Sequence, residues 1–334
     1  MHDIAVDLGT TSTLMAASGR GIVLVEPSLV AVRPRTREVV AVGVGAERLL
    51  ERESGSLIGV RPLEHGIITD FELAVEMLRR FSRNVCQSRR ARPRMVVGVP
   101  SGATDVARRA VHEACLSAGA SEARLIEGPM AAAIGAGLPV AEAVGSLVVD
   151  IGGGITEVAL ISLGEIVAWR SIPVGGDDLD AAIVKHLRRD HGLLVSQRTA
   201  EEVKRRIGFA FPNKDDNRVE IFGYDTRSAL PNTAVLTSEE IGCVLERHVA
   251  RIVEAIKETL GGTPPELSSD ILDRGTVLVG GGALLKGLEG RLRQETHMPA
   301  QVAELPLTCV AAGSCAWLEE LKDGRFPEVI ESWR

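Results

Sequence analysis

An aspartate followed by a glycine and two threonines stands near the start of the chain. Asp7 lies at the end of an apolar run, and Gly9, Thr10 and Thr11 follow after one intervening leucine. A glycine lets the backbone approach an anion, and backbone N–H groups together with threonine hydroxyls are donors that suit a phosphate. A carboxylate at the end of a strand suits a magnesium ion, held through water. The motif predicts a phosphate loop with a metal ligand, although a plain hairpin explains this single motif equally well.

A second motif repeats this plan in the later half of the chain. Asp150 ends another apolar run and precedes Gly152, Gly153 and Gly154. Three successive glycines between two strands weaken a sheet, so a purely structural role explains them poorly. We expect a second phosphate loop here, with Asp150 facing the same metal ion as Asp7. The repetition also indicates an internal duplication, which would place two similar halves on either side of a cleft.

A third glycine run, Gly280, Gly281 and Gly282, follows an apolar segment near the C-terminal end. It predicts a helix N-terminus at which a flat base or a ribose can approach the backbone. Glu201 and Lys204 share one face of a predicted helix and are candidates to contact the purine or the ribose. For this pair alone, a solvated helix face is the simpler interpretation. The sequence has no G-x-x-x-x-G-K-[ST] motif, so these loops are not those of a P-loop protein.

Helices and hairpins are predicted between these motifs. Apolar residues at helical spacing, with polar caps or terminal glycines, predict helices at 71–85 after Asp70, 105–118 before Gly119, 199–207 with a T-A-E-E capping box, and 237–260 with T-S-E-E. Apolar runs on either side of turn residues predict hairpins at 29–42 and 218–236, and turn residues predict loops at 211–217 and 262–269. We expect these hairpins to belong to small subdomains inserted into each half.

The bulk composition is that of a globular protein with more than one domain. Of its 334 residues, 45% are hydrophobic but only 3% aromatic, so the core is expected to consist mainly of Val, Leu, Ile and Ala. A net charge of −7 argues against general affinity for nucleic acid. No signal peptide is visible, and the longest apolar stretch, 131–154, is interrupted by Pro139, Glu142 and Asp150. We therefore expect a cytoplasmic protein.

The cysteines and histidines show no spacing typical of a metal site. The five cysteines are far apart and form no C-x-x-C pair, which favours idle thiols in a reducing compartment. No ligand spacing is visible either among six histidines, from which we predict no second site: His65, His112, His186, His191, His248 and His297.

The order of the three glycine motifs resembles that of the actin, sugar-kinase and DnaK-type chaperone superfamily. Within it the chain is similar to the MreB branch, the bacterial actins that shape cells, from residue 4 to about residue 320. The stretches that carry this resemblance include GIVLVEPSLVAV (21–32), RPLEHGIITDFE (61–72), VGVPSGATDVARRAV (97–111), PMAAAIGAGLPV (129–140), RTAEEVKRRIG (198–208), GGGALLKGLEGRL (280–292) and LPLTCVAAGS (305–314).

The resemblance implies an α/β, actin-like duplicated fold of two lobes, each with a core subdomain and a smaller inserted subdomain, with a nucleotide cleft between them. It implies ATP and Mg²⁺ as cofactors. It also implies protomers that stack head to tail into protofilaments, which pair antiparallel on the inner membrane and organise peptidoglycan synthesis. The implied partners are further copies of the chain or a paralogue, anionic lipids of the inner membrane, and the cell-wall elongation machinery.

Matching positions imply a role for each candidate residue. The first phosphate loop would be formed by Asp7, Gly9, Thr10 and Thr11, the second by Asp150, Gly152, Gly153 and Gly154, and the nucleoside site by Gly280, Gly281, Gly282, Glu201 and Lys204. The core of lobe I is expected to comprise 1–29, 66–143 and 315–334, with 30–65 as its small subdomain. The core of lobe II is expected to comprise 144–180 and 245–314, with 181–244 as its small subdomain.

Two positions depart from the family pattern. The family usually reads Glu-Glu-Pro-Met where this chain has Glu127-Gly128-Pro129-Met130, and G-G-G-T-T-E where Ile155 replaces the first threonine. In the family the replaced glutamate and threonine orient the attacking water. Glu127 is one residue, about 100°, away around a helix and is not expected to substitute. We predict that nucleotide binds but that ATP hydrolysis is weak or impaired, although Gly128 is also an acceptable N-cap before Pro129.

The route to the membrane also differs from the family. Some members use an amphipathic N-terminal helix and others an apolar pair in one loop, whereas residues 87–94 of this chain are basic. Such a loop can attract anionic lipid at about 1 kcal/mol for each charge near the surface. A solvated surface loop is the alternative. The protein is thus expected at the periphery of the cytoplasmic membrane.

Two other functions are open to this superfamily. A small-molecule kinase of the sugar-kinase type needs a carboxylate base in a substrate pocket, for which we find no motif. A chaperone-like ATPase needs a substrate domain after residue 320, which the sequence lacks. The filament-forming protein is therefore the preferred interpretation, with the kinase as the alternative.

Overall fold

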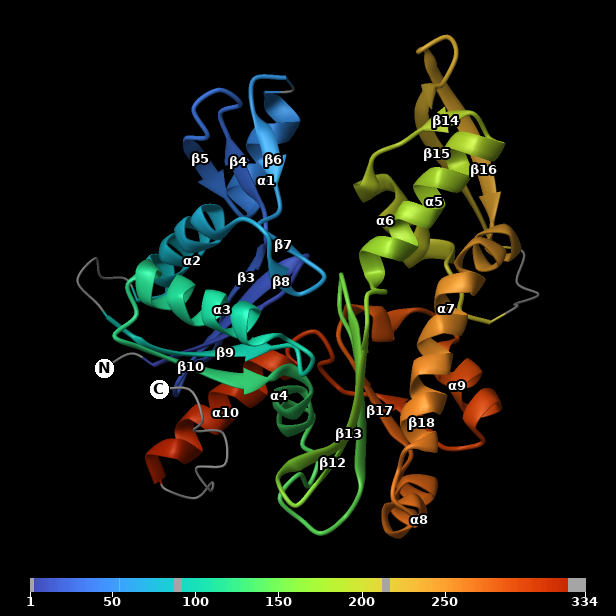
Figure 1. The fold of residues 1–334 in the computed structure, drawn as a ribbon. Coiled ribbons are helices and arrows are strands. Elements are labelled where there is room, and N and C mark those ends of the chain that lie inside the picture. The colour runs from blue at the N-terminus through green and yellow to red at the C-terminus, as the bar shows by residue number, and fades with distance from the viewer. Residues whose placement is uncertain (1–2, 54, 87–91, 212–216, 324–334) are drawn as a thin grey trace.

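The computed structural model describes residues 3–53, 55–86, 92–211 and 217–323. Two five-stranded sheets form the centres of two lobes (Figure 1). The sheet of lobe I has the order β10-β9-β1-β2-β3, from β1 Ile4–Leu8, β2 Ser12–Ala17, β3 Gly21–Pro27, β9 Arg94–Val99 and β10 Glu122–Glu127. The sheet of lobe II has the order β13-β12-β11-β17-β18, from β11 Ser146–Ile151, β12 Thr156–Ser162, β13 Glu165–Ile172, β17 Thr276–Val279 and β18 Ala300–Val302.

The two sheets share one topology. In each, the central strand (β1 or β11) pairs antiparallel with the next strand and parallel with a later one. Asp7 lies opposite Leu14 in the antiparallel pair, and Asp150 lies opposite Glu157. The aspartates therefore occupy equivalent places near the carboxyl ends of the central strands, as the predicted duplication requires.

Buried apolar side chains join the lobes as well as filling them. One large core lies in each lobe. A third group combines Val96 and Ile126 of lobe I with Val148 and Ile161 of lobe II, and Trp317 packs with them. Burying one large apolar side chain contributes roughly 1.5–3 kcal/mol. This shared group therefore fixes the lobes to each other on the side away from the small sheets.

Two helices cross closely in that shared region. They are α4 Gly128–Gly135 and α10 Cys309–Asp323, and glycines lie at their crossing. A Cβ atom on Gly135 would lie 1.9 Å from the Cys309 carbonyl oxygen, and one on Gly313 would lie 1.8 Å from that of Ala131. Because larger residues would force the helices apart, both glycines are required by the packing.

A smaller three-stranded sheet accompanies each lobe, and both lie at the same end of the molecule (Figure 1). The first consists of β4 Val30–Val32, β5 Val39–Val42 and β6 Ile58–Val60, with α1 Val44–Arg52 and the short pair β7 Leu63–Glu64 and β8 Ile67–Ile68 nearby. The second consists of β14 Leu193–Leu194, β15 Arg218–Asp225 and β16 Pro231–Thr237, beside α5 Gly176–Asp190 and α6 Gln197–Ile207. Arg198 of α6 forms an ion pair with Glu51 of α1, and this contact links the regions around the two small sheets.

Three of the four predicted helices begin and end within one residue of their predicted bounds. The helix α2 Phe71–Cys86 starts after Asp70, whose Oδ1 accepts from the Leu73 N–H at 3.2 Å. The helix α3 Asp105–Ala118 ends at Gly119, which adopts a left-handed conformation with φ 111°. The helix α7 Ser238–Gly261 is capped by Thr237. The hairpins predicted at 29–42 and 218–236 are also present.

Three local predictions were wrong. The helix α6 begins two residues early, because Ser196 rather than Thr199 provides the cap. The predicted loop 262–269 gives way to α8 Pro265–Arg274, which a proline at its first position can start. The third glycine run leads into a four-residue 3₁₀ helix, η1 Gly281–Leu284, before α9 Leu288–Thr296, instead of starting an α-helix. Residues 212–216 of the other predicted loop lie outside the described part.

The proposed subdomain boundaries divide three continuous helices. Those at 180/181, 244/245 and 314/315 fall within α5, α7 and α10. The division into subdomains stays a proposal. Within the described residues, every helix is too short or too polar to span a lipid bilayer.

Candidate functional site

A cavity of about 440 Å³ opens between the lobes. This volume lies within the range typical of small-molecule sites. Its lining includes every candidate residue of the two predicted phosphate loops and the predicted nucleoside site: Asp7, Gly9, Thr10, Thr11, Asp150, Gly152, Gly153, Gly154, Glu201, Lys204, Gly280, Gly281 and Gly282. The structure therefore brings together segments that are far apart in the sequence.

The first loop is a tight turn between β1 and β2. The Gly9 N–H donates to the Ser12 carbonyl oxygen at 3.1 Å, and a Cβ atom on Gly9 would lie 2.6 Å from that oxygen. The Thr10 hydroxyl accepts from the Gly66 N–H at 2.9 Å. The Thr11 hydroxyl donates across the cleft to Asp177 Oδ2 at 3.0 Å. The threonines thus connect this turn to its surroundings within lobe I and across to lobe II.

The second loop touches the first. A Cβ atom on Gly153 would lie 1.7 Å from the Thr11 hydroxyl oxygen, and one on Gly154 would lie 2.7 Å from that of Thr10. The same loop accepts from the start of α5, where the Gly176 N–H donates to the Gly152 carbonyl at 3.0 Å. The glycines are therefore required by the approach of the two loops, in addition to any role in holding an anion.

The two aspartates are close enough to influence each other. Both carboxylates are enclosed by protein and open on the cavity. Burial raises the pKa of Asp7 to about 7, with a further contribution from the charge of Asp150. Burial likewise raises the pKa of Asp150 to about 6. Two enclosed carboxylates that repel each other are a donor set that a divalent cation with oxygen ligands would stabilise, so these residues fit the predicted magnesium site.

The third glycine run packs against the second loop. Gly280 has φ 79°, and a Cβ atom there would lie 2.4 Å from Asp150 Oδ1. One on Gly282 would lie 2.2 Å from the Ile151 side chain. These glycines keep the backbone at the floor of the cavity and leave Asp150 uncovered.

Glu201 and Lys204 differ in what they contact. Lys204 Nζ donates to the Gly176 carbonyl at 2.9 Å and pairs with Asp180 Oδ1 at 2.8 Å. Burial raises the pKa of Asp180 to about 6, although the Lys204 charge opposes this shift. Lys204 therefore holds the start of α5, and its ammonium group already has protein partners. Glu201 is exposed at the cavity edge, and contact of either residue with a nucleoside stays a prediction.

The family model for "MreB/Mbl protein" matches residues 1–325. This chain belongs to the MreB/Mbl family. It is 47% identical over 324 residues to the cell shape-determining protein MreB of Escherichia coli K12, covering 95% of this chain and 93% of that protein. It is 42% identical over 321 residues to the cell shape-determining protein Mbl of Bacillus subtilis 168, covering 96% of each.

Solved structures confirm the actin-like fold of this MreB/Mbl family member. Its structure is similar to that of MreB5 of Spiroplasma citri bound to ADP, with a TM-score of 0.90 and 35% identity over 97% of this chain and 98% of that one. The same protein bound to AMPPNP matches with the same score and identity over 97% of each chain. A MamK double helical filament matches at a TM-score of 0.81 and 19% identity, over 95% of this chain and 98% of that one, which shows the fold alone.

Gly128 and Ile155, the two residues that the sequence comparison predicts to depart from the family pattern, both line the cavity. Gly128 is the first residue of α4, with Glu127 rather than Gly128 at the N-cap. The Glu127 side chain points to Arg108, 3.4 Å from its Nη2, and is not part of the cavity lining. Ile155 is an aliphatic residue at the end of the second loop. Neither of the two positions therefore presents a polar side chain to the cavity.

A buried carboxyl group that was not predicted from the sequence, that of Glu157, lies beside Gly128. Glu157 Oε1 accepts from the Ser101 N–H at 2.9 Å, and a Cβ atom on Gly128 would lie 3.1 Å from its Oε2. Burial raises the pKa of Glu157 to about 8, and the charge of Asp150 contributes in the same direction. Asp177, which receives the Thr11 hydroxyl, was also missed. The register that places Glu157 opposite Asp150 becomes evident only once the two strands are paired.

Two further features were not visible in the sequence. The histidines show no metal-ligand spacing along the chain, yet His186 and His191 meet at Glu240 in the structure. Arg94, included in the basic loop, belongs to β9 and binds Asp3 through two hydrogen bonds of 3.0 and 2.7 Å. Residues 87–91 of that loop lie outside the described part. All five cysteines are free, and only Cys243 is exposed.

Proposed function

We propose that this chain binds ATP in the cavity, with Mg²⁺ near Asp7 and Asp150, and assembles into filaments that organise cell-wall synthesis and cell shape. The observation that carries the proposal is the convergence of three glycine runs and two enclosed aspartates on one cavity. The MreB5 relatives bound to ADP and AMPPNP, and relatives described as cell shape-determining, support it.

The binding chemistry follows from the residues that line the cavity. The turns at Gly9 and Gly152–Gly154 expose backbone near the two aspartates, as an approaching phosphate chain requires. Asp7 and Asp150 would hold the metal, through water. Bound Mg²⁺ supplies positive charge that neutralises the phosphate oxygens. The backbone at Gly280–Gly282 is open for the nucleoside, with Glu201 at the cavity edge.

We further propose that ATP hydrolysis is slow. Gly128 and Ile155 offer no group that orients a water molecule, and Glu127 is turned toward Arg108. Glu157 is the carboxyl group nearest to Gly128, and burial raises its pKa, which favours the protonated form and disfavours it as a general base. Loss of a positioned general base lowers a rate by roughly 10²–10⁴-fold.

Phosphate release at saturating ATP tests the slow turnover. The Escherichia coli MreB relative, measured under the same conditions, provides the reference rate. We expect this chain to release phosphate at least about 100-fold more slowly. A rate equal to that of the relative would contradict the proposal.

Pelleting assays test the filament. Purified chain would be centrifuged with ATP, with ADP and without nucleotide, and the pellets viewed by electron microscopy. ATP-dependent filaments are the expected result. A chain that binds ATP but stays in the supernatant and phosphorylates sugars would support the kinase alternative.

We also place these filaments at the cytoplasmic face of the inner membrane. Because Arg94 is engaged by Asp3, the lipid interaction rests on Arg89, Arg90 and the exposed Arg92. Co-sedimentation with vesicles of neutral and of anionic lipid would test this. Preference for anionic vesicles that salt abolishes is expected, whereas equal binding to neutral vesicles would contradict it. The cell-wall elongation machinery is the partner that this location implies.

A further inference from the structure

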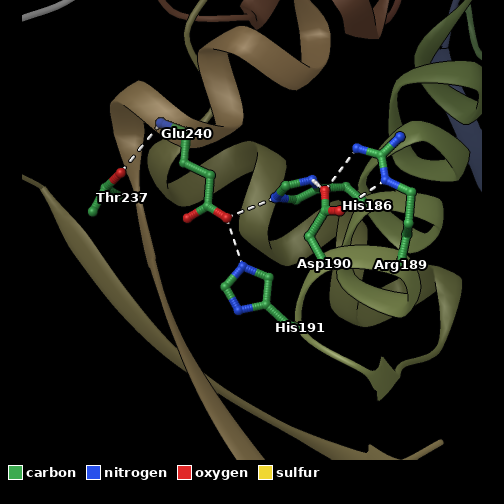
Figure 2. Close-up of polar contacts among 6 residues, drawn as sticks. All are labelled: His186, Arg189, Asp190, His191, Thr237 and Glu240. Carbon is green, nitrogen blue, oxygen red and sulfur yellow. Dashed lines mark hydrogen bonds and ion pairs between the residues drawn. The ribbon is translucent and has the colours of Figure 1, made fainter.

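Two histidines and a glutamate from different helices converge at one end of α5 (Figure 2). His186 lies near the C-terminal end of α5, His191 directly follows that helix, and Glu240 lies in the first turn of α7. Nε2 of each histidine lies 2.6 Å from Oε1 of Glu240. One ligand atom from each residue lies within 4.8 Å of the other two. These three residues, hereafter the histidine cluster, lie outside the cavity between the lobes.

A second carboxylate orients one of the histidines. Asp190 Oδ2 lies 2.6 Å from Nδ1 of His186, and the Arg189 guanidinium holds the same carboxylate at 2.7 Å. A histidine that donates its Nδ1–H to a carboxylate presents a lone pair at Nε2, the arrangement found behind metal-bound imidazoles. In neutral His186, Nε2 and Oε1 of Glu240 are then two acceptors facing each other, and a proton or a metal cation between them is needed.

The cluster is accessible from solvent. The side chains of His186, His191 and Glu240 are 13%, 26% and 26% exposed, so an ion can reach them from solvent. The Glu240 N–H donates to Thr237 at 3.2 Å, which fixes the start of α7.

We propose that His186, His191 and Glu240 bind one divalent transition-metal ion of the zinc type. The ligands are Nε2 of each histidine and a carboxylate oxygen, with water as the fourth. Two imidazoles and one carboxylate suit Zn²⁺ or Co²⁺, whereas Mg²⁺ prefers oxygen ligands alone. Ligands in a tetrahedron around a metal at about 2.0–2.1 Å are roughly 3.3 Å apart, so each imidazole withdraws from the carboxylate by less than about 1 Å.

Such an ion would join the end of α5 to the start of α7. The other end of α5 contacts the second loop, where the Asp177 N–H donates to the Gly153 carbonyl at 2.8 Å. The cluster therefore lies at the far end of a helix that begins at the cavity. An ion that binds only the folded chain raises its melting temperature by mass action, and this increase provides a readout independent of ATP.

The test is metal titration of tag-free chain that has been dialysed against a chelator. Calorimetry with Zn²⁺ is expected to give one site per chain, and Co²⁺ is expected to give the strong visible absorption of a tetrahedral complex. His191→Ala and Glu240→Gln each remove a ligand and should weaken binding by about 100-fold or more. Asp190→Asn removes the orienting carboxylate and should weaken it by about 10- to 100-fold.

Two matched controls exclude other sites. His112→Ala removes a histidine of α3, and Cys243→Ser removes the exposed thiol one turn after Glu240. Both should leave Zn²⁺ affinity and the Co²⁺ spectrum unchanged. Failure of the unmutated chain to bind one Zn²⁺, or an unchanged affinity in a folded His191→Ala chain, would overturn the proposal. The Co²⁺ spectrum of the unmutated chain decides the matter even if a variant fails to fold, because absence of tetrahedral bands also rejects the site.

Discussion

The two loops at the cavity occupy equivalent places in the two sheets but are built differently. The loop after β1 carries the side chains of Thr10 and Thr11, whereas the loop after β11 carries successive glycines at 152–154. The two threonine hydroxyls fill the space in which Cβ atoms of Gly153 and Gly154 would lie. One half of the duplication thus supplies side chains that reach across the cleft, and the other half supplies room for them.

This difference changes how a glycine run is interpreted. If the glycines served only to make the backbone flexible or to contact a phosphate, substitutions at the three positions should be tolerated to a similar degree. If they serve to let the two loops approach each other, the tolerance to substitution should instead differ sharply from one glycine to the next. A Cβ atom on Gly152 would meet only the Ile155 carbonyl oxygen at 3.4 Å, an ordinary contact, whereas one on Gly153 would overlap Thr11.

The largest effect is expected from Gly153→Ala. Its Cβ atom would lie 1.7 Å from the Thr11 hydroxyl oxygen and 2.7 Å from the Thr11 Cβ, so the loops must separate. Overpacking of this kind costs roughly 3 kcal/mol, equivalent to about 150-fold weaker ATP binding. Titration with a fluorescent ATP analogue would measure this.

The matched control for that substitution is Gly152→Ala. Its affinity should stay within about threefold of the unmutated chain, because its Cβ atom meets no tight contact. Equal losses in the two variants would mean that the glycines serve the bound phosphate and not the contact between the loops.

The features that were predicted correctly from the sequence are those that neighbouring residues determine. Strands that end in aspartate, glycine turns and helix caps such as Thr237 are encoded by neighbouring residues, and the structure has them in place. Asp177, Glu157 and the histidine cluster depend on pairing between distant segments. His186 and His191 are five residues apart, a spacing that no regular helix face brings together, and only the end of α5 at His191 allows both to reach Glu240. The direction in which the chain turns after α5 cannot be inferred from a single sequence.

The aspartates allow a second test of the equivalence of the lobes. Asp7→Asn and Asp150→Asn each keep the size of the side chain but remove a charge that would hold Mg²⁺ through water. Each should weaken Mg²⁺-dependent ATP binding by about 10- to 100-fold, as expected for loss of charge-assisted hydrogen bonds. Calorimetry with Mg²⁺ and with a chelator would separate the metal-dependent part. A loss in only one variant would show that one lobe alone holds the metal.

The residues that pair with the two aspartates across the strands predict how the free energy of unfolding depends on pH. Asp7 faces Leu14, but Asp150 faces Glu157, whose folded pKa of about 8 exceeds its ordinary value of 4.5. The folded chain therefore keeps a proton that the unfolded chain releases, and this stabilising contribution is lost as pH rises toward 8. Relative to Glu157→Gln, the unmutated chain should lose on the order of 2 kcal/mol of unfolding free energy between pH 5 and 7.

Urea unfolding at several pH values would measure that difference. The substitution Glu113→Gln, at an exposed glutamate on α3, provides the control and should follow the unmutated chain at every pH. Parallel pH profiles for the Glu157→Gln variant and the unmutated chain would show that Glu157 titrates normally in the folded state.

The smallest effect concerns Ile155, where the second loop meets lobe I. Its Cδ1 would lie 3.1 Å from a Cβ atom on Gly66, so the side chain packs closely on the turn between β7 and β8. Ile155→Thr restores a hydroxyl that can orient water but removes part of that apolar contact. Phosphate release should rise by less than about tenfold, since Gly128 still lacks a carboxylate and a single hydrogen bond contributes about 1 kcal/mol. Should release rise 100-fold or more, the slow turnover would lie in Ile155 alone, and Gly128 would have no part in it.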